Sequence, residues 1–217
     1  MLLSYLFTNP AYFFLWLAAI LVAITVHEFA HAWMSDRLGD PTARLQGRVT
    51  LNPIAHLDPL GTLMLILFRF GWGKPVPFDP FNLRHPRRDA AIISFAGPAA
   101  DLILATLLSL MVRLGHLLLT PSLSYLLEIV LTPFIFLAII LAIFNLIPIH
   151  PLDGGKVLIG LLPEKIAYQW DQFLDRWGFL LILFLIFPFF GFSLVSVIIL
   201  PIVNLILALL LPGAPLI

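Results

Sequence analysis

Five largely apolar segments dominate the sequence and leave few folds open to it. A helix needs roughly 20 apolar residues to cross a bilayer core of about 30 Å. The chain also has 61% hydrophobic and only 11% charged residues, against about 45–50% and about 25% in soluble domains. We therefore expect an all-α membrane protein with about five transmembrane helices. The segments lie at residues 11–35, 90–112, 126–149, 175–189 and 192–211, the last two being separated around Pro188 and Gly191.

Charge and cysteine content exclude several classes of function. The formal net charge is +0, so the chain lacks the basic footprint of a nucleic-acid-binding protein. It has no cysteine, which excludes disulfides, iron–sulfur clusters and thiol nucleophiles, so any metal must be held by His, Asp or Glu. No internal repeat is visible. We expect residues 1–217 to form a single integral-membrane domain whose apolar N-terminal segment stays in the mature protein.

The basic residues predict the orientation of the chain in the membrane, because Lys and Arg are enriched in cytoplasmic loops. Lys156 and Lys165 follow the third segment. The loops 36–89 and 150–176 should therefore be cytoplasmic, with the N-terminus outside and the C-terminus inside a cell membrane. Of the 12 Lys and Arg residues, eight lie between the first two segments: Arg37, Arg44, Arg48, Arg69, Lys74, Arg84, Arg87 and Arg88.

Two shorter stretches between the first and second segments carry further expectations. Residues 57–70 are apolar but too short to span, which favours a re-entrant or interfacial segment shielded from lipid by protein. Residues 42–51 are β-prone around Gly47. They could form a short strand pair whose open edge binds an extended substrate, or an ordinary surface loop.

The first segment contains His27-Glu28-Phe29-Ala30-His31, an H-E-x-x-H motif. Residues four apart lie on one face of a helix, so both imidazoles can reach one metal ion while Glu28 acts on a metal-bound water. A charged residue near the middle of a membrane helix costs roughly 2.5–3.5 kcal/mol, which favours a functional role. The alternative is a group of polar side chains at the membrane edge that reach toward water.

A catalytic zinc site needs a third protein ligand besides the two histidines. Asp153 is the best candidate, because it follows the third segment on the same side of the membrane as the end of the first. Pro148 and Pro151 prevent a regular helix before it. Gly154 and Gly155 permit a tight turn that can aim the carboxylate inward.

Together, HEFAH and NLIPIHPLDGG resemble the paired signatures of the site-2 protease family of intramembrane zinc metalloproteases. The runs GRVTLNPIAHLDPLGT (47–62) and SFAGPAAD (94–101) are similar to the short bacterial-type branch of that family, without an appended PDZ-type module. The resemblance extends from about residue 20 to residue 160. Two signatures in the expected order are far more specific than either alone.

The resemblance implies a role for each of five residues. His27, His31 and Asp153 would bind one Zn²⁺ per chain, and Glu28 would be the general base. Asn145 would lie near the scissile carbonyl, where its amide could stabilise the oxyanion. For Asn145 the alternative is an amide that is hydrogen-bonded between helices.

Other polar residues have more than one reading. Asp101 stands where the family usually has asparagine, at a depth in the membrane comparable to that of His27, so the two could face each other. A protonated Asp101 could then donate a hydrogen bond. The alternative is an ionised Asp101 that faces a water-filled cavity and has no role. His56 and Asp58 could form a secondary polar site or cap the 57–70 segment. His150 could be a fourth ligand in a resting state or simply be solvated.

The predicted function is that of a zinc-dependent metalloendopeptidase for regulated intramembrane proteolysis. It would hydrolyse peptide bonds of membrane-spanning protein substrates within or at the edge of the bilayer. One alternative is a metal-binding membrane transporter, which would not need Glu28 as a base and would commonly show a repeated half. Another is a catalytically inactive membrane scaffold of the same fold.

Overall fold

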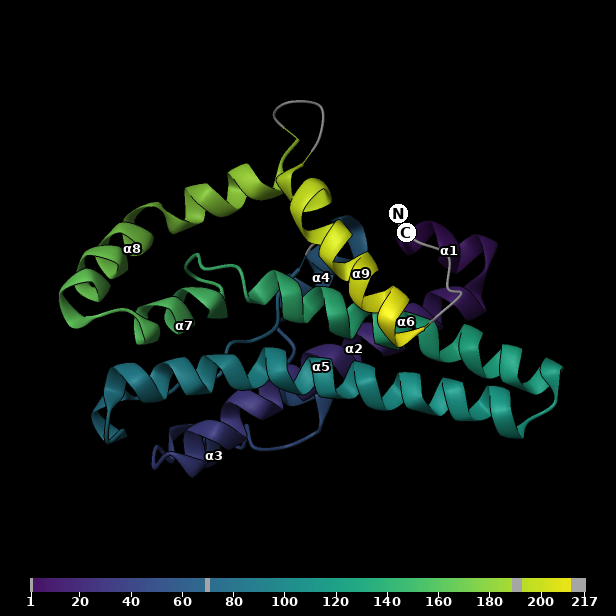
Figure 1. The fold of residues 1–217 in the computed structure, drawn as a ribbon, viewed down its shortest axis with the longest axis horizontal. Helices are drawn as coiled ribbons and strands as arrows, with labels where there is room; N and C mark the ends of the chain where they lie inside the picture. Colours follow the sequence, from purple (N-terminus) through teal and green to yellow (C-terminus); the bar gives the residue numbers. More distant parts are fainter. Residues whose placement is uncertain (1, 69–70, 189–192, 212–217) are drawn as a thin grey trace.

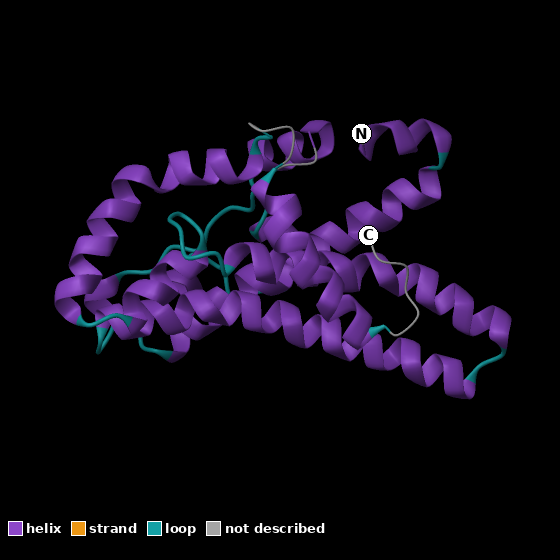
Figure 2. Cartoon of the chain, turned by 45° about the horizontal axis from the view of Figure 1, so that its top comes forward, coloured by secondary structure: helices purple, strands orange, loops and turns teal. Residues whose placement is uncertain are grey.

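The computed structural model describes residues 2–68, 71–188 and 193–211, and these residues are mostly helical (Figures 1 and 2). No strand occurs among them, and a single isolated antiparallel bridge pairs Leu57 with Gly73. Three short turns of 3₁₀- or π-helix cover Pro53–Ala55, Pro80–Asn82 and Val195–Ile199. The α-helices are α1 (Leu2–Thr8), α2 (Pro10–Arg37), α3 (Thr42–Leu45), α4 (Pro59–Phe68), α5 (Pro86–Leu118), α6 (Pro121–Asn145), α7 (Asp153–Leu161), α8 (Glu164–Ile186) and α9 (Leu200–Leu210).

Three helices form the centre of the molecule and confirm the first three predicted segments. Helices α2, α5 and α6 have 28, 33 and 25 residues, and each is long and apolar enough to cross a membrane. Each begins with a proline in its first turn, where a missing amide hydrogen costs nothing. All three pack against one another, and α7 lies along α5 (Figure 1).

The last two predicted segments differ from expectation in length and position. Helix α8 begins at Glu164, well before residue 175, and its first half carries charged residues. The apolar helix at Val195–Leu210 is shorter than a full span. The predicted break between these segments falls at residues 189–192, outside the described residues. By length and composition, the described residues contain three candidate spans.

The predicted strand pair at residues 42–51 is wrong. Residues 42–45 form α3, and Gly47 then reverses the chain with φ +69°. The reason is local capping: the Asp40 carboxylate accepts hydrogen bonds from the backbone amide and the hydroxyl of Thr42, which favours a helical turn over an extended strand.

The apolar segment 57–70 contains the ten-residue helix α4. Asp58 caps it, because its Oδ1 accepts a hydrogen bond of 2.7 Å from the Gly61 amide. His56 is fully buried and its Nε2 lies 2.8 Å from the carbonyl oxygen of Thr50. The structure thus supports the capping role for Asp58 and gives His56 a structural contact.

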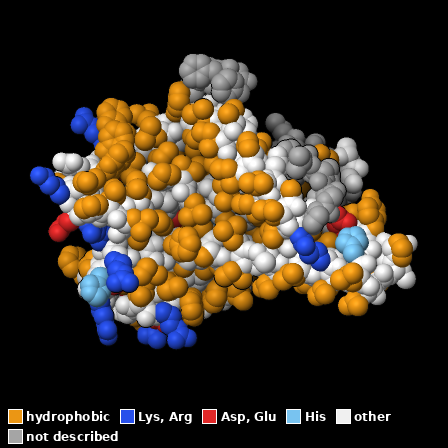
Figure 3. Space-filling view, viewed as in Figure 1, with side chains coloured by type: hydrophobic (Ala, Val, Ile, Leu, Met, Phe, Trp, Pro, Cys, Tyr) orange, Lys and Arg blue, Asp and Glu red, His pale blue; other side chains and the backbone are white. Residues whose placement is uncertain are grey.

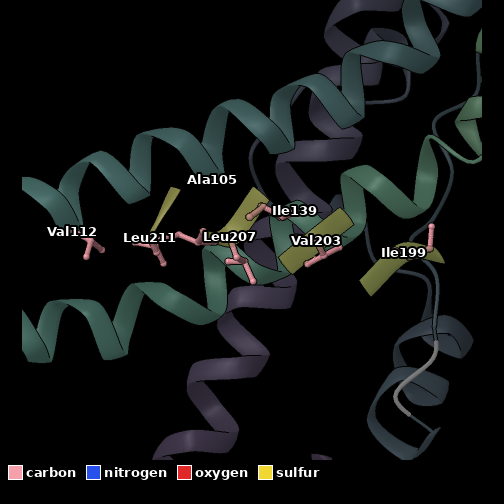
Figure 4. Close-up of a cluster of buried hydrophobic side chains, with 9 residues drawn as sticks. Ala105, Val112, Ile139, Ile199, Val203, Leu207 and Leu211 are labelled. Carbon is pink, nitrogen blue, oxygen red and sulfur yellow. The ribbon is translucent and has the colours of Figure 1, made fainter. Parts of the chain in front are cut away.

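A cluster of buried apolar side chains joins α9 to α5 and α6 (Figure 4). Small residues let these helices approach closely, as is usual where lipid removes most of the hydrophobic driving force. Ala105 and Ala138 are fully buried there. The cluster comprises Ala105, Val112, Ile135, Ala138, Ile139, Ile199, Val203, Leu207 and Leu211.

The surface separates into an apolar body and a basic end. Hydrophobic side chains cover most of the face shown in Figure 3, while most of the Lys and Arg side chains on this face gather at the end that carries α3 and α8. An extensive apolar surface of this kind suits a lipid environment.

Candidate metal centre

Helix α2 presents both histidines of the HEFAH motif to α5. His27 and His31 are buried, and their Nε2 atoms lie 3.0 Å apart. The four-residue spacing places the two rings one helical turn apart on the same face. The predicted pairing of the two histidines is therefore present in the fold.

Asp153 completes a three-atom cluster with these histidines. Its Oδ2 lies 3.1 Å from Nε2 of His27 and 3.2 Å from Nε2 of His31. Asp153 is the first residue of α7, reached through an irregular stretch after α6. Ligand atoms about 2.0–2.1 Å from a tetrahedral zinc ion lie about 3.3 Å apart, so the observed spacing fits one face of such a site.

The other ring nitrogens fix the orientation of the two imidazoles. Nδ1 of His31 lies 2.7 Å from the carbonyl oxygen of Ile93, and Nδ1 of His27 lies 2.7 Å from Oδ2 of Asp101. A carbonyl oxygen can only accept, so the His31 Nδ1 carries the hydrogen, and a carboxylate at Asp101 places it on the His27 Nδ1 as well. Each neutral ring then directs an Nε2 lone pair toward the Asp153 carboxylate.

This arrangement brings three hydrogen-bond acceptors together in a buried place. Two imidazole lone pairs and a carboxylate oxygen within 3.2 Å of one another repel unless a cation or a proton lies between them. The residues therefore fit a bound divalent metal, and the Nδ1 contacts are those that usually orient metal-binding histidines. Asp101 lies beside His27 as its depth predicted, with its Oδ2 at hydrogen-bond distance from Nδ1 of His27.

Two glycines keep the centre open. A Cβ atom at Gly97 would lie 2.5 Å from Nε2 of His31 and 2.8 Å from Cε1 of His27. At Gly154 it would lie 2.3 Å from the carbonyl oxygens of Leu146 and Ile147. Glycine at 97 leaves room for the rings, and glycine at 154 allows the close turn expected after Asp153.

The Asp153 carboxyl is held in its charged form. Burial acts to raise its pKa, but when a proton rather than a cation lies between the three facing atoms, hydrogen bonds from His27 and His31 outweigh burial and lower the pKa below its usual range. Asp153 thus offers an anionic oxygen to a metal at neutral pH.

Glu28 lies beside the backbone segment at residues 73–75, which the sequence patterns did not identify as part of the site. Its Oε2 is buried and has no hydrogen-bond partner within residues 2–68, 71–188 and 193–211, and a Cβ at Gly73 would lie 3.4 Å from its Oε1. Arg48 holds this segment by donating hydrogen bonds to the carbonyl oxygens of Lys74 and Pro75. Burial lowers the pKa of Arg48, and the charge of Glu28 opposes that shift. No local signal separates Arg48 from the other basic residues.

Asn145 and His150 form hydrogen bonds with groups outside the His27–His31–Asp153 cluster. Nδ2 of Asn145 donates to the carbonyl oxygen of Leu141 in its own helix, at 3.0 Å. Nδ1 of His150 lies 2.9 Å from Oδ1 of Asp175 in α8. The structure therefore gives His150 a partner other than solvent and directs it away from Asp153.

Comparison with known proteins places the chain in a family. A protein of Bacillus subtilis (strain 168) named "Putative zinc metalloprotease YwhC" is 38% identical over 169 residues, which are 76% of this chain and 77% of that protein. The family model for peptidase family M50 matches residues 120–187. The chain belongs to peptidase family M50. The resemblance to site-2 proteases is thereby confirmed.

A second relative matches a similar share of the chain. A Mycolicibacterium smegmatis protein named "Putative zinc metalloprotease Rip2" is 32% identical over 183 residues, covering 80% of this chain and 67% of that protein. No solved structure matches the chain significantly. The M50 family match over residues 120–187 includes Asp153, while the HEFAH motif lies in the earlier part of the chain.

Proposed function

We propose that this M50 chain is an intramembrane zinc metalloendopeptidase in which His27, His31 and Asp153 hold one Zn²⁺ per chain. The convergence of two Nε2 atoms and one carboxylate oxygen within 3.2 Å carries the proposal. The names of the two relatives support zinc as the metal. So does the ligand set, because imidazole and carboxylate are common zinc ligands.

In the proposed mechanism, Glu28 moves the protons. Bound zinc would acidify the attacking water and polarise the scissile carbonyl. Glu28 takes one proton from that water as its oxygen bonds to the carbonyl carbon, and returns a proton to the amine nitrogen as the C–N bond breaks. The buried Glu28 Oε2, which has no hydrogen-bond partner in the described part of the chain, supports this role. Asn145 would assist the oxyanion only after its amide leaves the Leu141 carbonyl oxygen.

The chemistry is tested with Glu28→Gln, which keeps the size of the side chain but cannot accept the proton. We expect the variant to retain zinc while cleavage of a membrane-embedded peptide falls at least about 100-fold. Glu128→Gln is the matched control, because Glu128 lies in the spanning helix α6, where it contacts His116. A Glu28→Gln protein that cleaves at the wild-type rate would require a different base.

The same experiment separates the alternatives. An inactive scaffold would bind zinc without cleaving even in the wild-type form. A transporter would move metal across vesicles equally well with Glu28→Gln. A chelator should abolish wild-type cleavage, and added zinc should restore it.

We further propose five spans in a cell membrane, with α4 as a re-entrant segment and the centre open to the cytoplasm for membrane-spanning protein substrates. The basic end of the molecule supports this orientation (Figure 3). Because the chain has no cysteine, single cysteines can be labelled without background. A cysteine at Ser4 or Ser122 should react with an impermeant reagent outside intact cells, and one at Gln46 should not. The reverse pattern would invert the topology.

A further inference from the structure

A second group of potential metal ligands lies between α8 and the stretch that leads to Asp153. It consists of His150, in that stretch, and Asp171 and Asp175, one turn apart on α8. One ligand atom from each residue lies within 4.8 Å of the other two. Helix α8 also contacts α7, whose first residue is Asp153 (Figure 1).

Close glycines hold His150 between two helices, one beside its ring and one beside its backbone. A Cβ at Gly155 in α7 would lie 2.1 Å from Cδ2 of His150, and one at Gly178 in α8 would lie 2.2 Å from the His150 carbonyl oxygen. The His150 side chain is only 15% exposed. Its two nitrogens therefore have a defined direction before any ligand binds, which reduces the entropy lost on binding.

The two ring nitrogens have different surroundings. Nδ1 lies 2.9 Å from Oδ1 of Asp175, at hydrogen-bond distance. Nε2 is buried and has no hydrogen-bond partner among the residues that the structure describes; Oδ1 of Asp171, at 3.9 Å, is too far away. A buried polar atom without a partner indicates a missing water or ion. His27 has the same pattern, with Nδ1 on a carboxylate and Nε2 facing a second one.

We propose that His150, Asp171 and Asp175 bind a second divalent cation of the Zn²⁺ or Co²⁺ type. Imidazole nitrogen and carboxylate oxygen suit such ions. Asp171 and Asp175 are 48% and 70% exposed, so their side chains can adjust to a metal, and water can complete its coordination. The cation ties α8 to the stretch before Asp153 and binds more weakly than the ion in the buried centre.

Metal content of the purified full-length protein tests the site without reference to cleavage. After equilibrium dialysis against buffered free Zn²⁺ at rising concentrations, wild type should bind one ion tightly and a second more weakly. Asp171→Asn/Asp175→Asn should weaken the second ion at least about 10-fold, since even indirect partners of a metal are worth that much, and should leave the first unchanged. In a His27→Ala/His31→Ala background, only the weaker ion should remain.

His116→Ala/Glu128→Gln is the matched control, because it removes a His–carboxylate contact of 3.1 Å that has no third potential ligand among the described residues; the second ion should remain. A wild-type protein that never exceeds one zinc would overturn the proposal, leaving His150 and Asp175 as an ordinary ion pair. So would a second zinc that is unaffected by Asp171→Asn/Asp175→Asn. Either result leaves the assignment of the buried centre untouched.

Discussion

The buried His27–His31–Asp153 centre and the peripheral His150–Asp171–Asp175 cluster use the same side-chain chemistry in different surroundings. In the first, the three facing atoms lie 3.0–3.2 Å apart. In the second, one separation is 3.9 Å and the carboxylates are largely exposed. Packing around the buried centre fixes ligand positions that the exposed cluster leaves adjustable.

Desolvation explains why the two should differ in affinity. Buried lone pairs and charges cannot be satisfied by water, so leaving them without a cation is costly. Exposed carboxylates are hydrated and lose that hydration on binding a metal. The buried centre should therefore hold its ion far more tightly, and the following variants test that difference.

The largest effect should come from removing a histidine from each cluster. His31→Ala should lose the tight zinc and all measurable cleavage, because two remaining ligands chelate poorly. His150→Ala should keep the tight zinc, since its ring hydrogen-bonds Asp175 instead of joining the buried centre. Zinc per chain after dialysis checks both variants. Loss of the tight zinc from His150→Ala would mean that the two clusters act as one site.

Two glycines of α5 allow a steric test of the buried centre. Gly97→Ala should weaken zinc binding more than about 100-fold, beyond the usual loss for an indirect partner, because its Cβ would lie 2.5 Å from Nε2 of His31. Gly115→Ala is the control, since its nearest contact is the flexible end of Leu127 at 2.6 Å. Zinc competition with a chelator measures both. Equal affinities would mean that the rings can move aside.

Asp101 tests whether orientation of a ligand matters in the buried centre. Asp101→Leu should lower zinc affinity about 10–100-fold, because His27 loses the acceptor for its Nδ1 hydrogen. Asp101→Asn should recover most of the affinity, since its carbonyl oxygen can still accept that hydrogen. Chelator competition over several pH values is the measurement. An Asp101→Leu protein with wild-type affinity would make the 2.7 Å contact incidental.

The smallest effect concerns Asp40, a buried carboxylate that needs no ion. Burial acts to raise its pKa, but hydrogen bonds from Thr42, Asn82 and the Asp79 amide lower it to about 2, from 3.8. The folded state thus has the lower pKa, so the stabilisation is full above about pH 4 and is lost as pH falls through about 2. It should amount to about 1–2 kcal/mol.

Thermal unfolding in detergent, compared between wild type and Asp40→Asn, checks this prediction. The wild type should be more stable at neutral pH, and the difference should shrink as the pH falls below about 4. A difference that stays constant down to about pH 2 would show that the Asp40 charge contributes nothing.

Local patterns in the sequence determined the parts of this protein that depend on helix geometry. The three long apolar segments became α2, α5 and α6, because span length depends only on the hydrophobic run. The HEFAH spacing placed His27 and His31 on one face, because residues four apart are neighbours on any α-helix. The paired motifs also pointed to Asp153 and to the M50 family.

Only the tertiary structure decided which distant groups meet. Asp101 and Asp153 lie 74 and 126 residues from His27, and their approach depends on how α2, α5 and α7 pack. Local periodicity likewise did not predict three other features. These are the contact of His150 with α8, the position of Arg48 beside the backbone segment next to Glu28, and the helix at residues 42–45. Periodicity describes which face of a helix is apolar, whereas the partner of that face is set by packing and by the hydrogen bonds that buried polar groups must make.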